Sequence, residues 1–330
     1  MIPFDFTQPD DEESAIALVS GNKNASFIAG GTTLVDLMKL NVQSPSSLVS
    51  ITALPLNTIE TLSDGVLRIG SMVHMSDAAI DPLILDAYPV ISEALLAGAS
   101  PQLRSMATIG GNLMQRTRCY YFRDTSFACN KRIPGSGCPA IEGYNRMHAV
   151  LGTSDKCIAT HASDLCVALA ALDAVIRVEG PQETVRKIPI NNFYLEPGNT
   201  PEEENELQHG ELITAVDLPL LPFSKKSHYL KVRDRSSYEF ALVSVATAVD
   251  IRNNSIRSAR IALGGVATKP WRAYEAEQSL SGKTPNRASF RSAAEIALRG
   301  AKPRGDNAFK IELAERAIIK ALTTVSQKEE

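Results

Sequence analysis

The stretch FIAGGTTL, residues 27–34, decides the fold. Its apolar residues predict a short strand at 26–29, which runs into Gly30 and Gly31, and a helix is expected at 34–40. Paired glycines at such a turn expose backbone N–H groups without obstruction by Cβ atoms, an arrangement that binds phosphate oxygens. The turn matches neither GxGxxG nor GxxxxGK[ST], which argues against Rossmann and P-loop proteins.

A second turn, TIGGNL at residues 108–113, has the same ingredients. Gly110 and Gly111 permit close approach to a ligand, and Thr108 and Asn112 offer side-chain hydrogen bonds. Either turn alone is usually a plain connection between a strand and a helix. Two of them in one chain favour a phosphate-containing ligand.

The rest of the chain is predicted to be mixed α/β. Thr33 and Asp36, three residues apart, form a capping-box pattern at the start of the first glycine-turn helix. Residues 196–211, acidic and rich in turn formers, are expected to be the main surface loop. A change in composition at 222–226 predicts a domain boundary, beyond which two long strands and two helices follow.

Four of the five cysteines lie just after the second turn: Cys119, Cys129, Cys138 and Cys157, separated by nine, eight and eighteen residues. Thiolates gathered in a loop rich in Gly, Pro and Arg suit an iron–sulfur cluster or a structural zinc. The segment has no CxxC pair, so zinc lacks its usual spacing; two disulfides and incidental thiols also remain open. Cys166 lies in an apolar run, which predicts a place in the core.

Charged and imidazole side chains surround these cysteines. Five basic residues either offset the negative charge of a cluster or form a solvated face: Arg116, Arg118, Arg123, Lys131 and Arg132. His148 and His161 are expected outside the ligand set, either behind it or in solvent, because four thiolates complete a cubane.

Composition excludes several classes of protein. The 330 residues are 44% hydrophobic, enough for two or three domains. The chain has 34 basic and 37 acidic residues, so its net charge creates no strong positive electrostatic field that would favour binding to nucleic acid. No apolar run is long enough to span a bilayer. The N-terminal sequence MIPFDFTQPDDEE lacks signal-peptide features, so export is expected only as the passenger of a signal-bearing partner.

Several motifs together resemble the FAD-binding subunit of the molybdenum hydroxylases. They are AGGTTL, TIGGNL, HASDL at 161–165, KVRDRSSYEFALVSVATAV at 231–249 and ALGGVATKPWR at 262–272. The resemblance covers nearly the whole chain. The cysteines lie in an insertion at about residues 115–160, which is similar to the insertions of periplasmic aldehyde oxidoreductases and of 4-hydroxybenzoyl-CoA reductases.

The resemblance implies the fold. Residues 1–222 would form a two-subdomain FAD-binding region of the PCMH type, as in the vanillyl-alcohol oxidase-like flavoproteins. Residues 223–330 would form an α+β C-terminal domain of the CO dehydrogenase flavoprotein type.

The resemblance also implies a site for each cofactor. The FAD ligands would be Ala29, Gly30, Gly31, Thr32, Thr33, Thr108, Gly110, Gly111, Asn112, Asp164, Lys231 and Tyr238. A 4Fe–4S cluster would be held by Cys119, Cys129, Cys138 and Cys157. No catalytic acid or base is expected in this chain.

The implied function is electron transfer within a heterotrimer that oxidises aldehydes to carboxylic acids. A molybdenum-cofactor subunit and a 2Fe–2S subunit would be the partners, and the complex would be periplasmic, with the cytoplasm as the alternative. A subunit of a 4-hydroxybenzoyl-CoA reductase-like complex and a zinc-stabilised nucleotide-binding scaffold are the competing functions.

Overall fold

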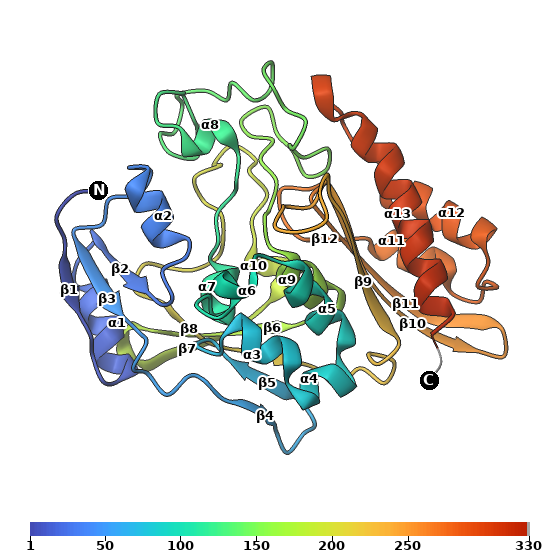
Figure 1. The fold of residues 1–330 in the computed structure, drawn as a ribbon, viewed down its shortest axis with the longest axis horizontal. Helices are drawn as coiled ribbons and strands as arrows, with labels where there is room; N and C mark the ends of the chain where they lie inside the picture. The colour runs from blue at the N-terminus through green and yellow to red at the C-terminus, as the bar shows by residue number, and fades with distance from the viewer. Residues whose placement is uncertain (329–330) are drawn as a thin grey trace.

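Three sheets organise residues 1–328, which are the residues that the computed structural model describes (Figure 1). The first is a parallel sheet in the order β1-β3-β2, formed by β1 (Asp5–Thr7), β2 (Ala25–Ile28) and β3 (Ser47–Ser50). Two helices connect these strands, α1 (Glu12–Ser20) and α2 (Leu34–Lys39). Asp11 begins α1 by accepting the N–H of Ser14 at 2.7 Å. The first glycine turn therefore leaves the end of β2, as its sequence predicts.

The second sheet is antiparallel, in the order β4-β5-β8-β6-β7. Its strands are β4 (Ile59–Thr61), β5 (Leu67–Gly70), β6 (Val175–Gly180), β7 (Thr184–Pro189) and β8 (Leu212–Leu218). Its helices are α3 (Met75–Ile80), α4 (Pro82–Ala87), α5 (Pro89–Ala97), α6 (Pro101–Arg104), α7 (Ile109–Leu113), α9 (Asp164–Ala171), α10 (Ile190–Phe193) and the 3₁₀ turn η1 (Pro181–Glu183). Helix α9 is buried along its length apart from Asp164, because its sequence DLCVALAA is apolar on every face.

The third sheet, β12-β11-β10-β9, forms the C-terminal region. Its strands are β9 (Ser227–Val232), β10 (Val243–Arg252), β11 (Ser255–Gly264) and β12 (Trp271–Arg272). Its helices are α11 (Tyr274–Leu280), α12 (Arg287–Ala297), α13 (Phe309–Ser326) and the 3₁₀ turn η2 (Gly305–Asn307). Helix α13 packs along β10 and β9, and a core of aliphatic and alanine side chains fills this layer.

The cysteine insertion connects α7 to α9 and contains the short helix α8 (Tyr120–Arg123). In Figure 1 it forms the green loops at the top, between the N-terminal elements on the left and the C-terminal sheet on the right. It contacts both sides. The backbone N–H groups of Val150 and Leu151 bond to the carbonyl of Val266, at 2.8 and 3.0 Å, and the N–H of His161 bonds to that of Ala267. Backbone hydrogen bonds therefore attach the insertion to the C-terminal region, and side chains of the insertion reach Asp36 of α2.

The architecture confirms the predicted combination of α/β and α+β regions. Residues 196–211 form an irregular loop with many exposed residues, as their composition predicts, but parts of this loop are held by hydrogen bonds. Their carbonyls and carboxylates bond to the insertion and to β7: Lys131 donates to the carbonyl of Pro201 at 2.9 Å, and Arg186 donates to Glu211 at 2.8 Å. Acidic residues there pair with partly buried cations, a contact that sequence composition does not reveal.

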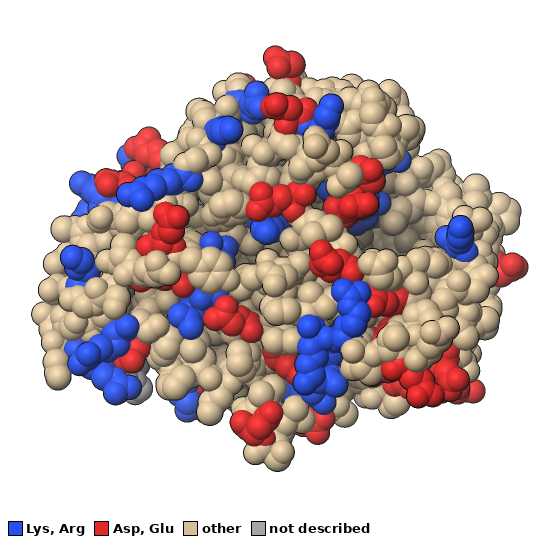
Figure 2. Space-filling model, turned by 180° about the vertical axis from the view of Figure 1, so that it is seen from behind, with Lys and Arg blue, Asp and Glu red and all other residues tan. Residues whose placement is uncertain are grey.

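The surface carries mixed charge, as the composition predicts. On the face drawn in Figure 2, Lys and Arg side chains alternate with Asp and Glu side chains. Among residues 1–328, no helix combines the length and the apolar character needed to cross a bilayer.

Candidate functional site

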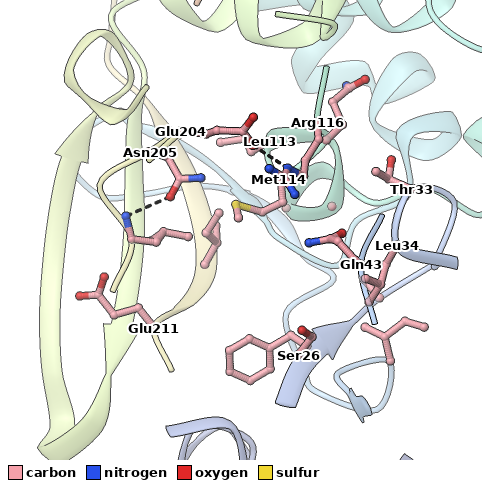
Figure 3. Close-up of a pocket in the computed structure, with 18 of the residues that line it drawn as sticks. Ser26, Thr33, Leu34, Gln43, Leu113, Met114, Arg116, Glu204, Asn205 and Glu211 are labelled. Atoms are coloured by element: carbon pink, nitrogen blue, oxygen red, sulfur yellow. Dashed lines mark hydrogen bonds and ion pairs between the residues drawn. The ribbon is translucent and has the colours of Figure 1, made fainter. Parts of the chain in front are cut away.

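The two glycine turns line one cavity, which we call the glycine-loop cavity. It has a volume of about 610 Å³ and includes residues 29–33 on one side and Thr108, Gly110 and Gly111 on another. Figure 3 shows Ser26, Thr33, Leu34 and Gln43 on one wall, facing Glu204, Asn205 and Glu211 on the other. The structure thus brings together eight of the predicted FAD ligands, from turns nearly eighty residues apart in the sequence.

The two turns use their backbone N–H groups differently. In the second turn, Gly110 donates to the carbonyl of Ser71 at 2.8 Å and Gly111 donates to Thr108 Oγ1 at 3.1 Å. In the first turn, no acceptor within residues 1–328 takes the N–H groups of Gly31 and Thr32. Unpaired backbone donors beside a cavity fit an anionic ligand, so the first turn suits phosphate oxygens better than the second.

Steric crowding explains why Gly30 and Gly110 have no side chain. A Cβ on Gly30 would lie 1.7 Å from the carbonyl oxygen of Met106, and one on Gly110 would lie 2.8 Å from Ser71 Cβ. Only Gly31, with φ of +70°, uses the left-handed region among the four glycines of these turns. Gly30 therefore packs against the segment that leads into the second turn, and Gly110 packs against Ser71, the residue that follows β5.

The predicted capping box at Thr33 is wrong. Thr33 begins α2 without a side-chain capping bond, and the Asp36 carboxylate points away to the insertion instead. There it pairs with Arg118 at 3.0 Å and with Arg123 at 2.8 Å. Hydrogen bonding from Arg123 is the main reason that the pKa of Asp36 is lowered. Two guanidinium groups compete for this carboxylate more strongly than one backbone N–H does.

The same pairing predicts a measurable link between α2 and the insertion. We expect Asp36→Asn to lower the free energy of unfolding by about 1 kcal/mol, since the carboxylate is partly exposed and solvent screens it. Protease should also cleave the insertion faster in this variant. The matched control is Asp86→Asn, because Asp86 pairs with Lys225 alone among residues 1–328 and both side chains are largely exposed. Equal effects of the two substitutions would contradict the link.

A second cavity, of about 670 Å³, lies between the insertion, the start of α9 and the C-terminal region. We call it the inter-domain cavity. Thr160 and His161 line both cavities, so the two meet there. Together they form an elongated space with one polar, glycine-lined end and one end lined by side chains of the C-terminal region, such as Phe240. A dinucleotide with two unlike halves fits such a space.

Asp164, the first residue of α9, lines the inter-domain cavity. Its carboxylate accepts from Tyr229 Oη at 2.6 Å and from Lys231 Nζ at 2.8 Å. The Lys231 side chain is thus buried against Asp164. As the structure describes the two cavities, Lys231 lines neither of them. We interpret Lys231 as the residue that orients Asp164 rather than as a cofactor contact.

The two other predicted ligands also lie off the cavity walls. Asn112 accepts from the Ser163 hydroxyl at 2.5 Å and donates to Met75 Sδ, so it ties the second turn to the start of α9. Tyr238 is 54% exposed in a turn with φ of +53°. Motif spacing places both near the site but cannot tell a supporting side chain from a contacting one.

The four insertion cysteines share a third, small cavity, the cysteine cavity. All are free thiols. Burial raises the pKa of Cys119 to about 12, and a hydrogen bond with Cys138 raises the pKa of Cys157. Cys166 lies apart, buried in α9 beside Tyr194 Oη at 3.0 Å. The expectation that these four cysteines form one group and that Cys166 is a core residue agrees with this arrangement.

The basic residues around the cysteines form neither a solvated face nor a free positive cluster. Arg116 and Lys131 donate to the partly buried carboxylate of Glu204, at 2.7 and 2.8 Å, and Figure 3 shows Arg116 directed at Glu204. Burial raises the pKa of Glu204, but the two cations outweigh it and lower the pKa overall. Arg132 donates to backbone carbonyls of the insertion, including that of Asp124 at 3.1 Å. These cations hold the insertion in place.

His148 is buried behind the cysteines, which is one of the two expected places, and His161 is partly buried. His148 lies with Nε2 3.1 Å from Cys119 Sγ. His161 accepts the N–H of Ser163 on Nδ1 at 3.3 Å, and burial lowers its pKa to about 4. Sequence reasoning also missed Glu204, whose only signal was its place in an acidic loop.

Family models match nearly the whole chain. Residues 2–221 match the FAD binding domain in molybdopterin dehydrogenase, and residues 228–325 match the CO dehydrogenase flavoprotein C-terminal domain. The chain is an FAD-binding subunit of the molybdenum hydroxylase family. It is therefore a subunit of an oxidoreductase.

Individual members of the molybdenum hydroxylase family are similar over most of their length. The aldehyde oxidoreductase FAD-binding subunit of Escherichia coli K12 is 49% identical over 90% of both chains. The glyceraldehyde dehydrogenase medium chain of Sulfolobus acidocaldarius is 28% identical over 86% of this chain and 83% of its own. A chain of carbon monoxide dehydrogenase from Hydrogenophaga pseudoflava has the same fold, with a TM-score of 0.77, 24% identity and 99% of both chains covered.

Proposed function

We propose that this protein is the FAD- and 4Fe–4S-containing electron-transfer subunit of a molybdenum-dependent aldehyde oxidoreductase. It would pass electrons from the 2Fe–2S clusters of a partner subunit to an external acceptor. The observation that carries the proposal is the convergence of four cysteines on one cavity beside two cavities suited to FAD. The 49% identity to an aldehyde oxidoreductase subunit supports aldehyde oxidation over aromatic-CoA reduction.

The cysteine cavity supports a cluster rather than a zinc ion. A zinc ion would need its ligand atoms at one point, about 2.3 Å from the metal. Among residues 1–328, no three His, Cys, Asp or Glu side chains are arranged in that way. A cubane holds its four thiolates farther apart, around four irons, and soft thiolates are its usual ligands. The four thiols from Cys119 to Cys157, three of them partly buried and one buried, match that donor set.

For FAD, we propose that the N–H groups of residues 30–33 bind the pyrophosphate and that Gly110 and Gly111 close the opposite wall. The flavin half would occupy the inter-domain cavity beside Asp164. Bound there, the flavin supplies the one- and two-electron chemistry. The protein orients it: Tyr229 and Lys231 fix the Asp164 carboxylate, and Asn112 fixes the second turn against α9.

The proposed partners are a molybdenum-cofactor subunit, where aldehyde would bind, and a 2Fe–2S subunit. Carbon monoxide dehydrogenase and glyceraldehyde dehydrogenase chains among the similar proteins carry the description "medium chain", which supports a complex of several subunits. Within residues 1–328, the five cysteines provide one group of four and one core residue, so a second cluster would have to lie on a partner. We propose that the assembled complex is periplasmic and that this chain is exported with a signal-bearing partner.

Purification of the chain alone tests this function. We expect about four irons, about four sulfides and one FAD per chain, and a flavin that dithionite reduces. Aldehyde should reduce neither flavin nor dye in the isolated chain, but it should bleach the flavin after co-expression with molybdenum and 2Fe–2S subunits. Aldehyde turnover by the chain alone, or zinc in place of iron, would contradict the proposal.

A further inference from the structure

The contact between His148 and Cys119 carries an inference beyond the assignment of ligands. His148 Nε2 lies 3.1 Å from Cys119 Sγ, and the side chain of His148 is almost fully buried. Its position is fixed on the backbone by the hydrogen bond from its own N–H to the carbonyl of Asn145, at 2.8 Å. The imidazole is thus held against one of the four thiols.

Cys119 has a distinct place among these thiols. Of the four cysteines, all within the described chain, it alone lines both the cysteine cavity and the inter-domain cavity. His148 also lines the inter-domain cavity. The pair therefore forms the wall between the proposed cluster and the proposed flavin half of FAD.

The proton in this contact must come from the imidazole. A thiolate bound to iron has no proton to donate, whereas a neutral imidazole carries one N–H. The imidazole of His148 offers that N–H from Nε2, the ring nitrogen that faces Cys119 Sγ at 3.1 Å. Its Nδ1 is buried and has no hydrogen-bond partner in the described chain. The tautomer with the proton on Nε2 is therefore favoured, because that proton can be donated to sulfur.

Lys310 supports this geometry from behind. It is fully buried in α13 and donates to the carbonyl of Met147 at 2.9 Å and to that of Gly265 at 2.7 Å. Because Met147 precedes His148, Lys310 anchors the backbone from which the imidazole projects. Helix α13 of the C-terminal region thereby positions a side chain against a cysteine of the insertion.

We propose that His148 donates an N–H···S hydrogen bond to the Cys119 thiolate and thereby raises the reduction potential of the cluster. A hydrogen bond to a ligating sulfur stabilises the reduced, more negative cluster, and such bonds are one of the protein's means of setting its potential. The inference rests on the proposed function, since it needs a cluster on Cys119. His148 is a positioning and tuning residue here and not a ligand.

Redox titration of the purified chain, followed by EPR, tests the proposal. We expect His148→Leu to retain iron and to shift the reduction equilibrium about tenfold toward the oxidised form, which is ~59 mV for one electron. His148→Gln keeps an N–H donor at similar reach and should shift less. The matched control is His228→Gln, because His228 bonds to Glu93 and lines none of the three cavities in the described chain. It should keep the wild-type potential.

A second measurement keeps the test decisive if His148→Leu fails to assemble a cluster. With ¹⁵N-labelled histidine, the reduced wild-type cluster should show a ¹⁵N hyperfine coupling that disappears in His148→Gln. Absence of the coupling in the wild type, a wild-type potential in His148→Leu, or equal shifts in the Leu and Gln variants would overturn the inference. A wild-type chain without iron would instead refute the proposed function itself.

Discussion

Cys129→Ser and Cys138→Ser should each remove most of the iron from the purified chain. Both thiols lie in the cysteine cavity, and a cubane that loses one of its four thiolates loses much of its stability. The insertion should loosen as well, because metal binding and local folding are coupled. Iron and acid-labile sulfide content measure the first effect, and the rate of proteolysis within the insertion measures the second.

Cys166→Ser is the matched control for these variants. Cys166 is fully buried, whereas Cys129 and Cys138 are partly buried, but it packs in α9 against Tyr194 and lies outside the cysteine cavity. It should retain full iron content, with a modest loss of stability from placing a hydroxyl in an apolar site. Full iron retention in both insertion variants would show that these thiols hold no cluster.

Gly111→Val should release FAD while leaving iron in place. Gly111 is exposed and lies on the wall of the glycine-loop cavity. Outside its own helix, the one described atom near an added Cβ would be Thr108 Oγ1, at 3.0 Å. A valine side chain would therefore fit the fold but project into the space for the cofactor. We expect at least a tenfold loss of FAD affinity, or about 1.4 kcal/mol, measured by flavin fluorescence during reconstitution.

Gly21→Val is a closely matched control. Gly21 is also exposed and has an ordinary negative φ, and its added Cβ would meet one oxygen, that of Ala17, at 3.1 Å. It does not line the glycine-loop cavity as the structure describes it. If Gly111→Val purified with one FAD per chain, or if both variants lost FAD equally, the second turn would not face the cofactor.

Sequence reasoning succeeded where local chemistry determines the structure. The strand–glycine–helix order around Gly30 and Gly31, the apolar α9 and the grouping of four cysteines all follow from residue type and spacing. Sequence reasoning failed where ion pairs between distant residues determine the position of a side chain. Asp36 looked like a capping residue because its partners, Arg118 and Arg123, lie more than eighty positions away.

The same limit applies to the site. Glu204 seemed to belong to a solvated acidic loop, yet Arg116 and Lys131 draw its carboxylate into the wall of the glycine-loop cavity. Lys231 matches a family segment near the flavin, but its ammonium contacts Asp164. Motifs identify which segments meet at a site. The direction of each side chain depends on the distant residues with which it pairs, and a single sequence does not reveal those pairs.

The ion pairs of the insertion bear on how this chain can be re-engineered. Asp36 on α2 and Glu204 in the 196–211 loop both take their cations from residues 116–131. Excising the insertion to mimic a clusterless relative would leave both carboxylates without their cations. Glu204, the less exposed of the two, would have to lose its charge or find a new cation. The insertion therefore cannot be deleted without disturbing the rest of the fold. A working graft, in either direction, would have to exchange positions 36 and 204 together with the cysteines.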